Sequence, residues 1–310
     1  MSSTSLQNAI LQTLAYSDIF DYPLTAAEIH RYLIGVSASL ASVQKTLTNQ
    51  FFGGQVVQTG VYFTLPGREG LAEIRVRRTA QSARLWPRAV QYGQRLAGFP
   101  FVRMVALTGT LAVNNVEHNA DVDYFIITEP GRLWFCRALI VGQVRLAARS
   151  GITLCPNFFL AESALALPDH TLYVAREITQ MIPLSGLEVY QRLREANRWV
   201  EEFLPNAGGP PPVRVSPPPA RPAAQTLLET VFRSPVGTAF ERWEMHRKIR
   251  KFTSQAASSS TETRFSPDRC QGHFDGYGKK TMDAFQTRLE KILEPINSHE
   301  FPSIPGTPRN

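Results

Sequence analysis

The fold of this chain is decided by the stretch VALTGTLAVNNVEHNADVDYFII, residues 105–127. An apolar run enters a turn at Gly109 and Thr110, and a second apolar run begins with an Asp-Val-Asp segment at Asp121 and Asp123. Successive side chains of a strand point to opposite faces, so the two aspartates would share one face. Two neighbouring carboxylates at the start of a buried strand are expected to hold hard divalent cations such as Mg²⁺.

The glycine turn has a complementary role in this interpretation. Gly109 lets the backbone turn sharply and approach a ligand closely. The Thr110 hydroxyl and the amides that follow it can donate hydrogen bonds to phosphate oxygens. The alternative is an ordinary hairpin with two solvated aspartates. Because two adjacent carboxylates repel each other, that alternative leaves their placement on an apolar strand unexplained.

The pattern of an apolar residue, Gly and Thr, about ten further residues and then Asp-apolar-Asp-apolar resembles the polymerase-beta-like nucleotidyltransferase superfamily. The match covers residues 107–110 and 121–124. Thr110 stands where the family more often has Ser, and it keeps the hydroxyl. The resemblance implies that Gly109 and Thr110 contact the triphosphate of a nucleotide and that the two aspartates are catalytic metal ligands.

The same resemblance implies a third carboxylate from a neighbouring strand. A segment rich in Arg and Leu, residues 131–150, is expected to be a helix ended by Gly151. Residues 152–162 follow as an expected core strand, and Glu162 is its single acid. Glu162 is therefore the candidate third metal ligand, with Asn157 facing the same pocket. A structural charge at the strand end is the alternative role for Glu162.

The reaction that the resemblance implies is nucleotidyl transfer. An acceptor hydroxyl or phosphate attacks the α-phosphorus of an NTP, and pyrophosphate leaves. Two Mg²⁺ ions held about 3.5–4 Å apart, with Mn²⁺ as a substitute, are the expected cofactors. Asp123 or Glu162 would accept the proton of the acceptor. The sequence identifies neither the NTP nor the acceptor, for which a nucleic acid and a protein are both considered.

The first 67 residues predict a winged-helix-like domain. Three helices and a hairpin are expected over residues 6–20, 25–33, 39–49 and 55–65. Thr25 and Glu28 form a capping-box pattern at the start of the second helix. The third helix carries Lys45 as its single cation, and one cation gives little electrostatic attraction for a phosphate backbone. Contact with a protein is therefore at least as well supported as reading of DNA or RNA.

The remaining chain is expected to complete an α+β fold. Its predicted parts are connecting basic helices over 68–98, a nucleotidyltransferase-like catalytic domain with a mixed sheet and helices over 99–204, a Pro-rich linker over 205–224, a C-terminal helical region over 225–297 and a disordered tail over 298–310. Helices are expected in these parts over 171–182, 187–204, 225–253 and 278–293.

Two groups of charged residues in these parts have alternative interpretations. The arginines of 68–98 form a solvated basic face or face the triphosphate. Arg176 and Glu177 either approach the site or, more simply, form an exposed ion pair.

Net charge, cysteine spacing and hydrophobic patterning indicate which classes of partner and which cellular compartment to expect. A net charge of +7 and a pI near 9.5 favour polyanionic partners such as nucleotides or nucleic acid. Cys136, Cys155 and Cys270 are widely spaced, which argues against a disulfide framework or a structural zinc site. The chain shows no leader peptide pattern and no apolar segment suited to a bilayer, so a cytoplasmic protein without a membrane partner is expected.

A second function remains open from the sequence. The chain would then be a non-catalytic winged-helix regulatory or nucleotide-binding protein with a degenerate nucleotidyltransferase domain. The intact Gly-Thr turn and Asp-Val-Asp segment favour the enzyme. The position of Glu162 at the very end of its strand, as the one candidate third carboxylate, favours the binding protein. The oligomeric state is not predicted.

Overall fold

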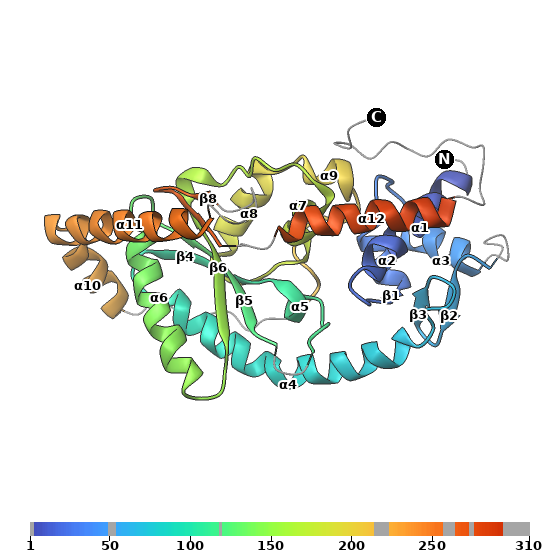
Figure 1. Cartoon of the computed structure of the whole chain (residues 1–310), viewed down its shortest axis with the longest axis horizontal. Helices are drawn as coiled ribbons and strands as arrows, with labels where there is room; N and C mark the ends of the chain where they lie inside the picture. The colour runs from blue at the N-terminus through green and yellow to red at the C-terminus, as the bar shows by residue number, and fades with distance from the viewer. Residues whose placement is uncertain are drawn as a thin grey trace.

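The computed structural model describes residues 3–48, 54–117, 120–213, 223–256, 264–272 and 276–293. These residues form an α+β fold with a three-stranded antiparallel sheet and a six-stranded mixed sheet (Figure 1). Within these ranges, every helix is too short or too polar to span a bilayer.

The N-terminal unit contains three helices and the smaller sheet. Its elements are α1 (Ser3–Asp18), β1 (Leu24–Thr25), α2 (Ala26–Arg31), α3 (Leu40–Thr48), β2 (Val57–Thr59) and β3 (Tyr62–Thr64), with the strands in the order β1-β3-β2. The predicted capping box is confirmed, because the Thr25 side chain accepts from the Glu28 amide and the Glu28 side chain accepts from the Thr25 amide. These bonds satisfy backbone donors that the start of α2 would otherwise leave free.

A single long helix, α4 (Leu71–Ala97), connects this unit to the larger sheet and runs beneath both (Figure 1). The connecting basic helices predicted over 68–98 form one continuous helix in the structure, and Pro87 lies inside it. Leu71, Ala89 and Leu96 are among the buried residues of the helix, so packing along its length holds it across the proline.

The larger sheet has the order β7-β4-β5-β6-β9-β8. Its strands are β4 (Val102–Leu107), β5 (Val122–Thr128), β6 (Leu154–Ala161), β7 (Ile182–Ser185), β8 (Arg264–Phe265) and β9 (Arg269–Gln271). β5 and β6 are parallel, with helix α6 (Leu133–Ala148) between them in the chain, and the other pairs are antiparallel. The sequence did not predict β7, β8 or β9. The parallel register places Cys155 beside Asp123.

Alternating residues of β5 contribute to two hydrophobic cores. Tyr124 and Ile126 pack on one side with residues of α4 and α6. Phe125 and Ile127 pack on the other side with the N-terminal unit and with α7 (Leu172–Gln180), α8 (Leu187–Ala196) and α9 (Val200–Phe203). Because Ile126 and Ile127 are fully buried, truncating either to Ala should cost about 2–5 kcal/mol.

The C-terminal region does not form a helical unit of its own. Its helices are α10 (Ala223–Phe232), α11 (Pro235–Ala256) and α12 (Tyr277–Leu293). The predicted helix over 225–253 is interrupted before Pro235, which cannot donate a backbone hydrogen bond. α11 packs on α6, β9 joins the large sheet through β6, and α12 packs on α1 and α7. The region therefore contributes to both halves of the molecule.

Two further predictions concern the Pro-rich segment and the tail. The described start of the segment packs on the protein, since Ala207 is buried and the Gly209 carbonyl accepts from Arg31 at 2.8 Å. Its later part, 214–222, and the predicted disordered tail, 298–310, lie outside the described residues.

Candidate functional site

The glycine turn lies directly against one of the two aspartates. β4 ends at Leu107, and the short helix α5 (Gly109–Ala112) begins at the turn. Gly109 has φ +64°, and a Cβ atom added there would lie 2.2 Å from Asp123 Oδ2. The Thr108 amide also donates to the Asp123 carbonyl at 3.1 Å. Only glycine allows this backbone conformation and this close approach together.

The two aspartates meet at the start of β5, together with a cysteine of the neighbouring strand. Candidate ligand atoms of Asp121, Asp123 and Cys155 all lie within 4.8 Å of one another, and all three side chains are half-buried. Asn157 Nδ2 donates to Asp123 Oδ1 at 3.1 Å, which confirms the prediction that Asn157 faces the same pocket. This hydrogen bond restrains the orientation of the carboxylate.

The electrostatics of this group are unfavourable without a cation. Burial, followed by the negative charges of Asp121 and Glu177, raises the pKa of Asp123 to about 7. Burial and the same aspartates raise the pKa of Cys155 to about 12. Cys155 is therefore a neutral thiol at neutral pH. A divalent cation would reverse these shifts, because it favours the charged form of a nearby carboxylate.

The environment predicted for Glu177, on α7, is wrong. Arg176 and Glu177 were predicted to form an exposed ion pair, but Arg176 is 5% exposed and its guanidinium lies 3.7 Å from the Tyr32 ring centroid. Glu177 Oε1 accepts from Gln180 Nε2 at 2.6 Å. Burial raises the pKa of Glu177 to about 7, although the neighbouring positive charge of Arg176 lowers it in part. Adjacent residues of a helix point in different directions, and this geometry could have shown that the two side chains separate.

Glu162 is not brought to the acidic group, so its prediction as third metal ligand is wrong. It begins the 3₁₀ turn η2 (Glu162–Ala164) after the far end of β6, where its carboxylate forms ion pairs with Arg192 and, at 3.9 Å, with Arg103. β6 runs parallel to β5, so its start and not its end lies beside Asp123. At about 3.3 Å per residue, the strand carries Glu162 roughly 20 Å away.

Two arginines of α4 form ion pairs with acids of the N-terminal unit and of the loop that precedes the aspartates. Arg75 forms an ion pair with Glu28 at 2.7 Å. Arg78 forms an ion pair with Glu117 and donates to Asn115 Oδ1 at 3.2 Å. Asn115 and Glu117 belong to the loop between the glycine turn and the aspartates, so Arg78 anchors that loop.

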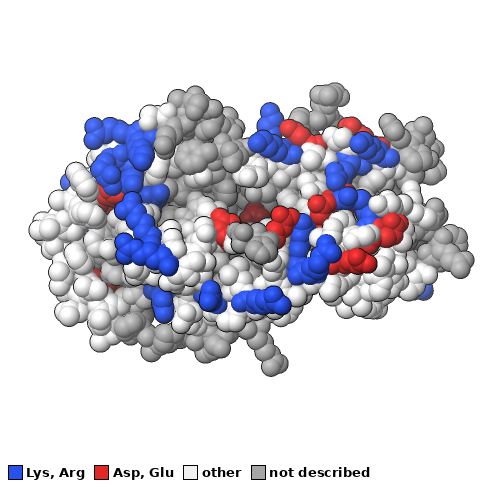
Figure 2. All heavy atoms as spheres, turned by 60° about the horizontal axis from the view of Figure 1, so that its bottom comes forward, with Lys and Arg blue, Asp and Glu red and all other residues white. Residues whose placement is uncertain are grey.

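On the face shown in Figure 2, several acidic side chains lie near the middle, with Lys and Arg on either side, and further acids lie among the basic side chains of the right half. Comparisons with protein families, with curated proteins and with solved structures find no match to this chain.

Proposed function

We propose that this protein is a Mg²⁺-dependent nucleotidyltransferase that moves a nucleoside monophosphate from an NTP to an acceptor and releases pyrophosphate. The observation that carries the proposal is the contact between the Gly109 turn and Asp123, with Asp121 beside it. The turn offers backbone donors for phosphate oxygens, and the strand offers carboxylates for the cation that accompanies a triphosphate.

The residues of the acidic group fit a divalent cation. Among the described residues, no Lys or Arg forms an ion pair with Asp121, Asp123 or Glu177. The pKa of Asp123, raised by burial and by neighbouring acids, is the expected property of a carboxylate arranged for a cation. Asp121 and Asp123 would hold Mg²⁺, or Mn²⁺ in its place. The bound ion would neutralise phosphate charge and lower the pKa of the acceptor.

The chain's own groups would position the nucleotide and move the proton. The Thr110 hydroxyl and the amides of the turn would bind phosphate oxygens. Asn157 holds the Asp123 carboxylate in one orientation. Glu177 replaces Glu162 in our proposal as the acid that accepts the acceptor's proton, since its pKa of about 7 suits proton transfer near neutral pH.

We also propose that the N-terminal unit is a winged helix that contacts a protein acceptor or partner. Its order of helix, strand, two helices and two strands supports this assignment. Helix α3, at the position of a recognition helix, is largely exposed and carries Lys45 as its single cation. A single cation gives little attraction for a phosphate backbone, which favours a protein contact over a nucleic acid.

Cys155 supports a second candidate function, a regulatory protein that binds a nucleotide without turnover. It occupies the strand position beside Asp123, where the resemblance implies a third carboxylate. A neutral thiol is a poor ligand for Mg²⁺, which prefers oxygen. The two functions differ in whether pyrophosphate is released.

The deciding experiment measures thermal stability and pyrophosphate release with each of the four NTPs and Mg²⁺, alone and with a cell extract as the source of acceptor. Ligand binding to the native state should raise the melting temperature. Transfer of label from the NTP into RNA, protein or a small molecule would identify the acceptor. Asp121→Ala and Asp123→Ala should fold and lose release. Stabilisation without release supports the second candidate, and the absence of both effects contradicts both functions.

A further inference from the structure

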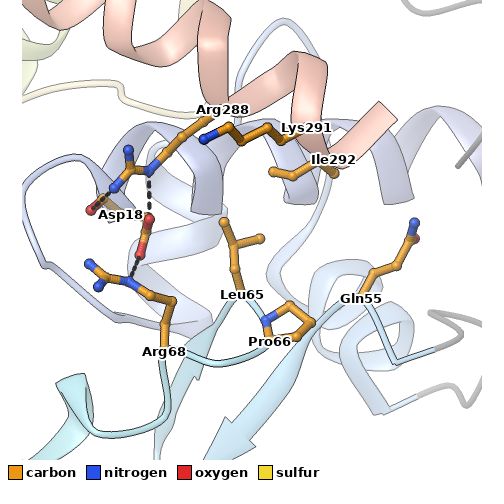
Figure 3. A pocket seen from close by; sticks show the side chains of 8 residues that line it. All are labelled: Asp18, Gln55, Leu65, Pro66, Arg68, Arg288, Lys291 and Ile292. Carbon is orange, nitrogen blue, oxygen red and sulfur yellow. Dashed lines mark hydrogen bonds and ion pairs between the residues drawn. The ribbon is translucent and has the colours of Figure 1, made fainter. Parts of the chain in front are cut away.

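A pocket lies between the N-terminal unit and the C-terminal helix α12, with a volume of 480 Å³ (Figure 3). Three cationic side chains line it, namely Arg68, Arg288 and Lys291. Leu65 and Ile292 give part of its wall an apolar character. Pockets that bind small ligands have volumes of roughly 300–1,000 Å³ and combine apolar walls with a few polar groups.

The positive charge of this pocket exceeds the negative charge in its wall. Asp18 is its single acid, and this one carboxylate accepts from Arg68 Nε at 2.7 Å and from Arg288 Nε at 2.6 Å. Arg68 also pairs with Asp21 outside the pocket wall. Lys291 forms no ion pair with any acid among the described residues. Three cations thus surround one acid, and Lys291 is the uncompensated charge.

The cations come from segments that are far apart in the sequence. Arg68 precedes α4, whereas Arg288 and Lys291 lie on the last helix, α12. Figure 3 shows Arg68 and Arg288 against the Asp18 carboxylate from opposite sides, with the Lys291 side chain extending toward Arg288. A ligand in this pocket would therefore connect the C-terminal helix to the N-terminal unit.

We propose that this pocket binds a small organic phosphate. The phosphate group would interact with Lys291 and with the outward N–H groups of Arg68 and Arg288, because guanidinium and ammonium groups both bind phosphate oxygens. The organic part would pack on Leu65, Pro66 and Ile292. This site is separate from the Asp121 and Asp123 group and does not depend on the proposed transfer reaction.

The test uses the full chain in EDTA, so that binding of phosphate through a metal at the acidic group is removed. Titration calorimetry compares phenyl phosphate, inorganic phosphate and phenol as probes. Phenyl phosphate should bind at least about fivefold more tightly than either fragment, because only it presents both chemical parts. An equal affinity for inorganic phosphate, or no saturable binding of phenyl phosphate, would overturn the proposal.

The variant Lys291→Ala locates the binding. It removes the uncompensated charge and leaves both Asp18 ion pairs in place, so the fold should be retained. Phenyl phosphate should then bind at least about fivefold more weakly. Lys280→Ala is the matched control on α12, because Lys280 lies 6.0 Å from the Tyr277 ring centroid and outside the pocket. Equal weakening in both variants would show non-specific attraction and contradict the site.

Discussion

Carboxylates lie close together at both ends of the large sheet, but the two ends differ in whether arginines form ion pairs with them. Asp121 and Asp123 meet at the start of β5, Glu177 on α7 adds its negative charge to theirs, and no described Lys or Arg forms an ion pair with these three acids. At the other end, Glu129, Glu162 and Glu229 surround Arg103. In the first group the acids repel one another and Arg176 offsets the charge of Glu177 in part, whereas the second group is neutralised. Unfavourable charge that the fold does not compensate is the property expected of a functional site.

The charged residues at the end of the sheet around Arg103 form a network of ion pairs rather than one pair. Arg103 Nη1 lies 2.9 Å from Glu229 Oε1, and Arg233 Nη2 lies 2.8 Å from Glu129 Oε2. The Phe101 amide donates to Glu229 at 2.8 Å. Each acid at this end therefore has a structural partner, so we assign this group to stability and the other group to chemistry.

The largest expected effect is on pyrophosphate release, which should depend on the acids at one end of the sheet and not on those at the other. Asp123→Asn should lower pyrophosphate release by about a thousandfold or more, because it removes a charge on which the cation depends. Glu162→Gln, at the neutralised end, should retain release within about threefold. Steady-state rates at saturating Mg²⁺ and NTP would measure both variants. Similar losses in the two variants would contradict the distinction between the ends.

The second effect concerns stability at the neutralised end. Arg103→Met should lower the free energy of unfolding by about 3–5 kcal/mol, because it leaves several partly buried carboxylates without their cation. Arg198→Met is the control, since the ion pair of Arg198 with Glu195 is exposed and should contribute less than about 1 kcal/mol. Urea unfolding of both variants tests this, and equal losses would show that the network adds nothing.

The third effect concerns Gly109, at the end of the sheet that carries Asp121 and Asp123. It separates the cost of placing Ala at a positive φ from the cost of the contact with Asp123. Gly109→Ala should destabilise the protein by about 2–4 kcal/mol and abolish release, because the new Cβ would displace the Asp123 carboxylate. Gly131→Ala has a similar φ of +71° with no atom within 4 Å, so it should cost only about 1–2 kcal/mol and leave release intact. Retained release in Gly109→Ala would argue against a role for this contact.

Local spacing explains which parts of the structure could be predicted. The capping box of Thr25 and Glu28 depends on residues three apart, and the shared face of Asp121 and Asp123 depends on strand alternation. Sequence reasoning failed where the answer depends on long-range pairing. The direction of β6 decides that Cys155 and not Glu162 lies beside Asp123, and no local pattern encodes that direction.

Short strands and helix packing were the other limits of prediction. β8 and β9 contain too few residues for an alternating pattern, and they form only because β6 offers an edge. Glu177 acts on Asp123 from α7, which sequence periodicity describes only as an amphipathic helix. The Gly109–Thr110 turn and the pair of Asp121 and Asp123 were thus predictable from the sequence. The residues that act on this pair from other elements, Cys155 and Glu177, were not.

The smallest expected effect is a difference in pH dependence between the two ends. Glu177 has a pKa raised to about 7 in the folded protein, so the folded state binds its proton more tightly than the unfolded state. Folding stability should therefore fall as pH rises from about 4.5 to 7, because ionisation is less favourable in the folded protein. Glu177→Gln removes this cost and should stabilise the metal-free protein by about 1–2 kcal/mol at pH 8, with no gain at pH 4.

The control for this effect is Glu162→Gln, which loses ion pairs and should destabilise the protein by about 1 kcal/mol at pH 8. Urea unfolding in EDTA at both pH values measures the two variants. Opposite signs at pH 8 are expected because the buried charge of Glu177 has no ion pair among the described residues, whereas Glu162 is paired. If Glu177→Gln were destabilising at pH 8, the interactions of the carboxylate with Gln180 and Arg176 would outweigh the cost of burying its charge, and its assignment to the acidic group would be wrong.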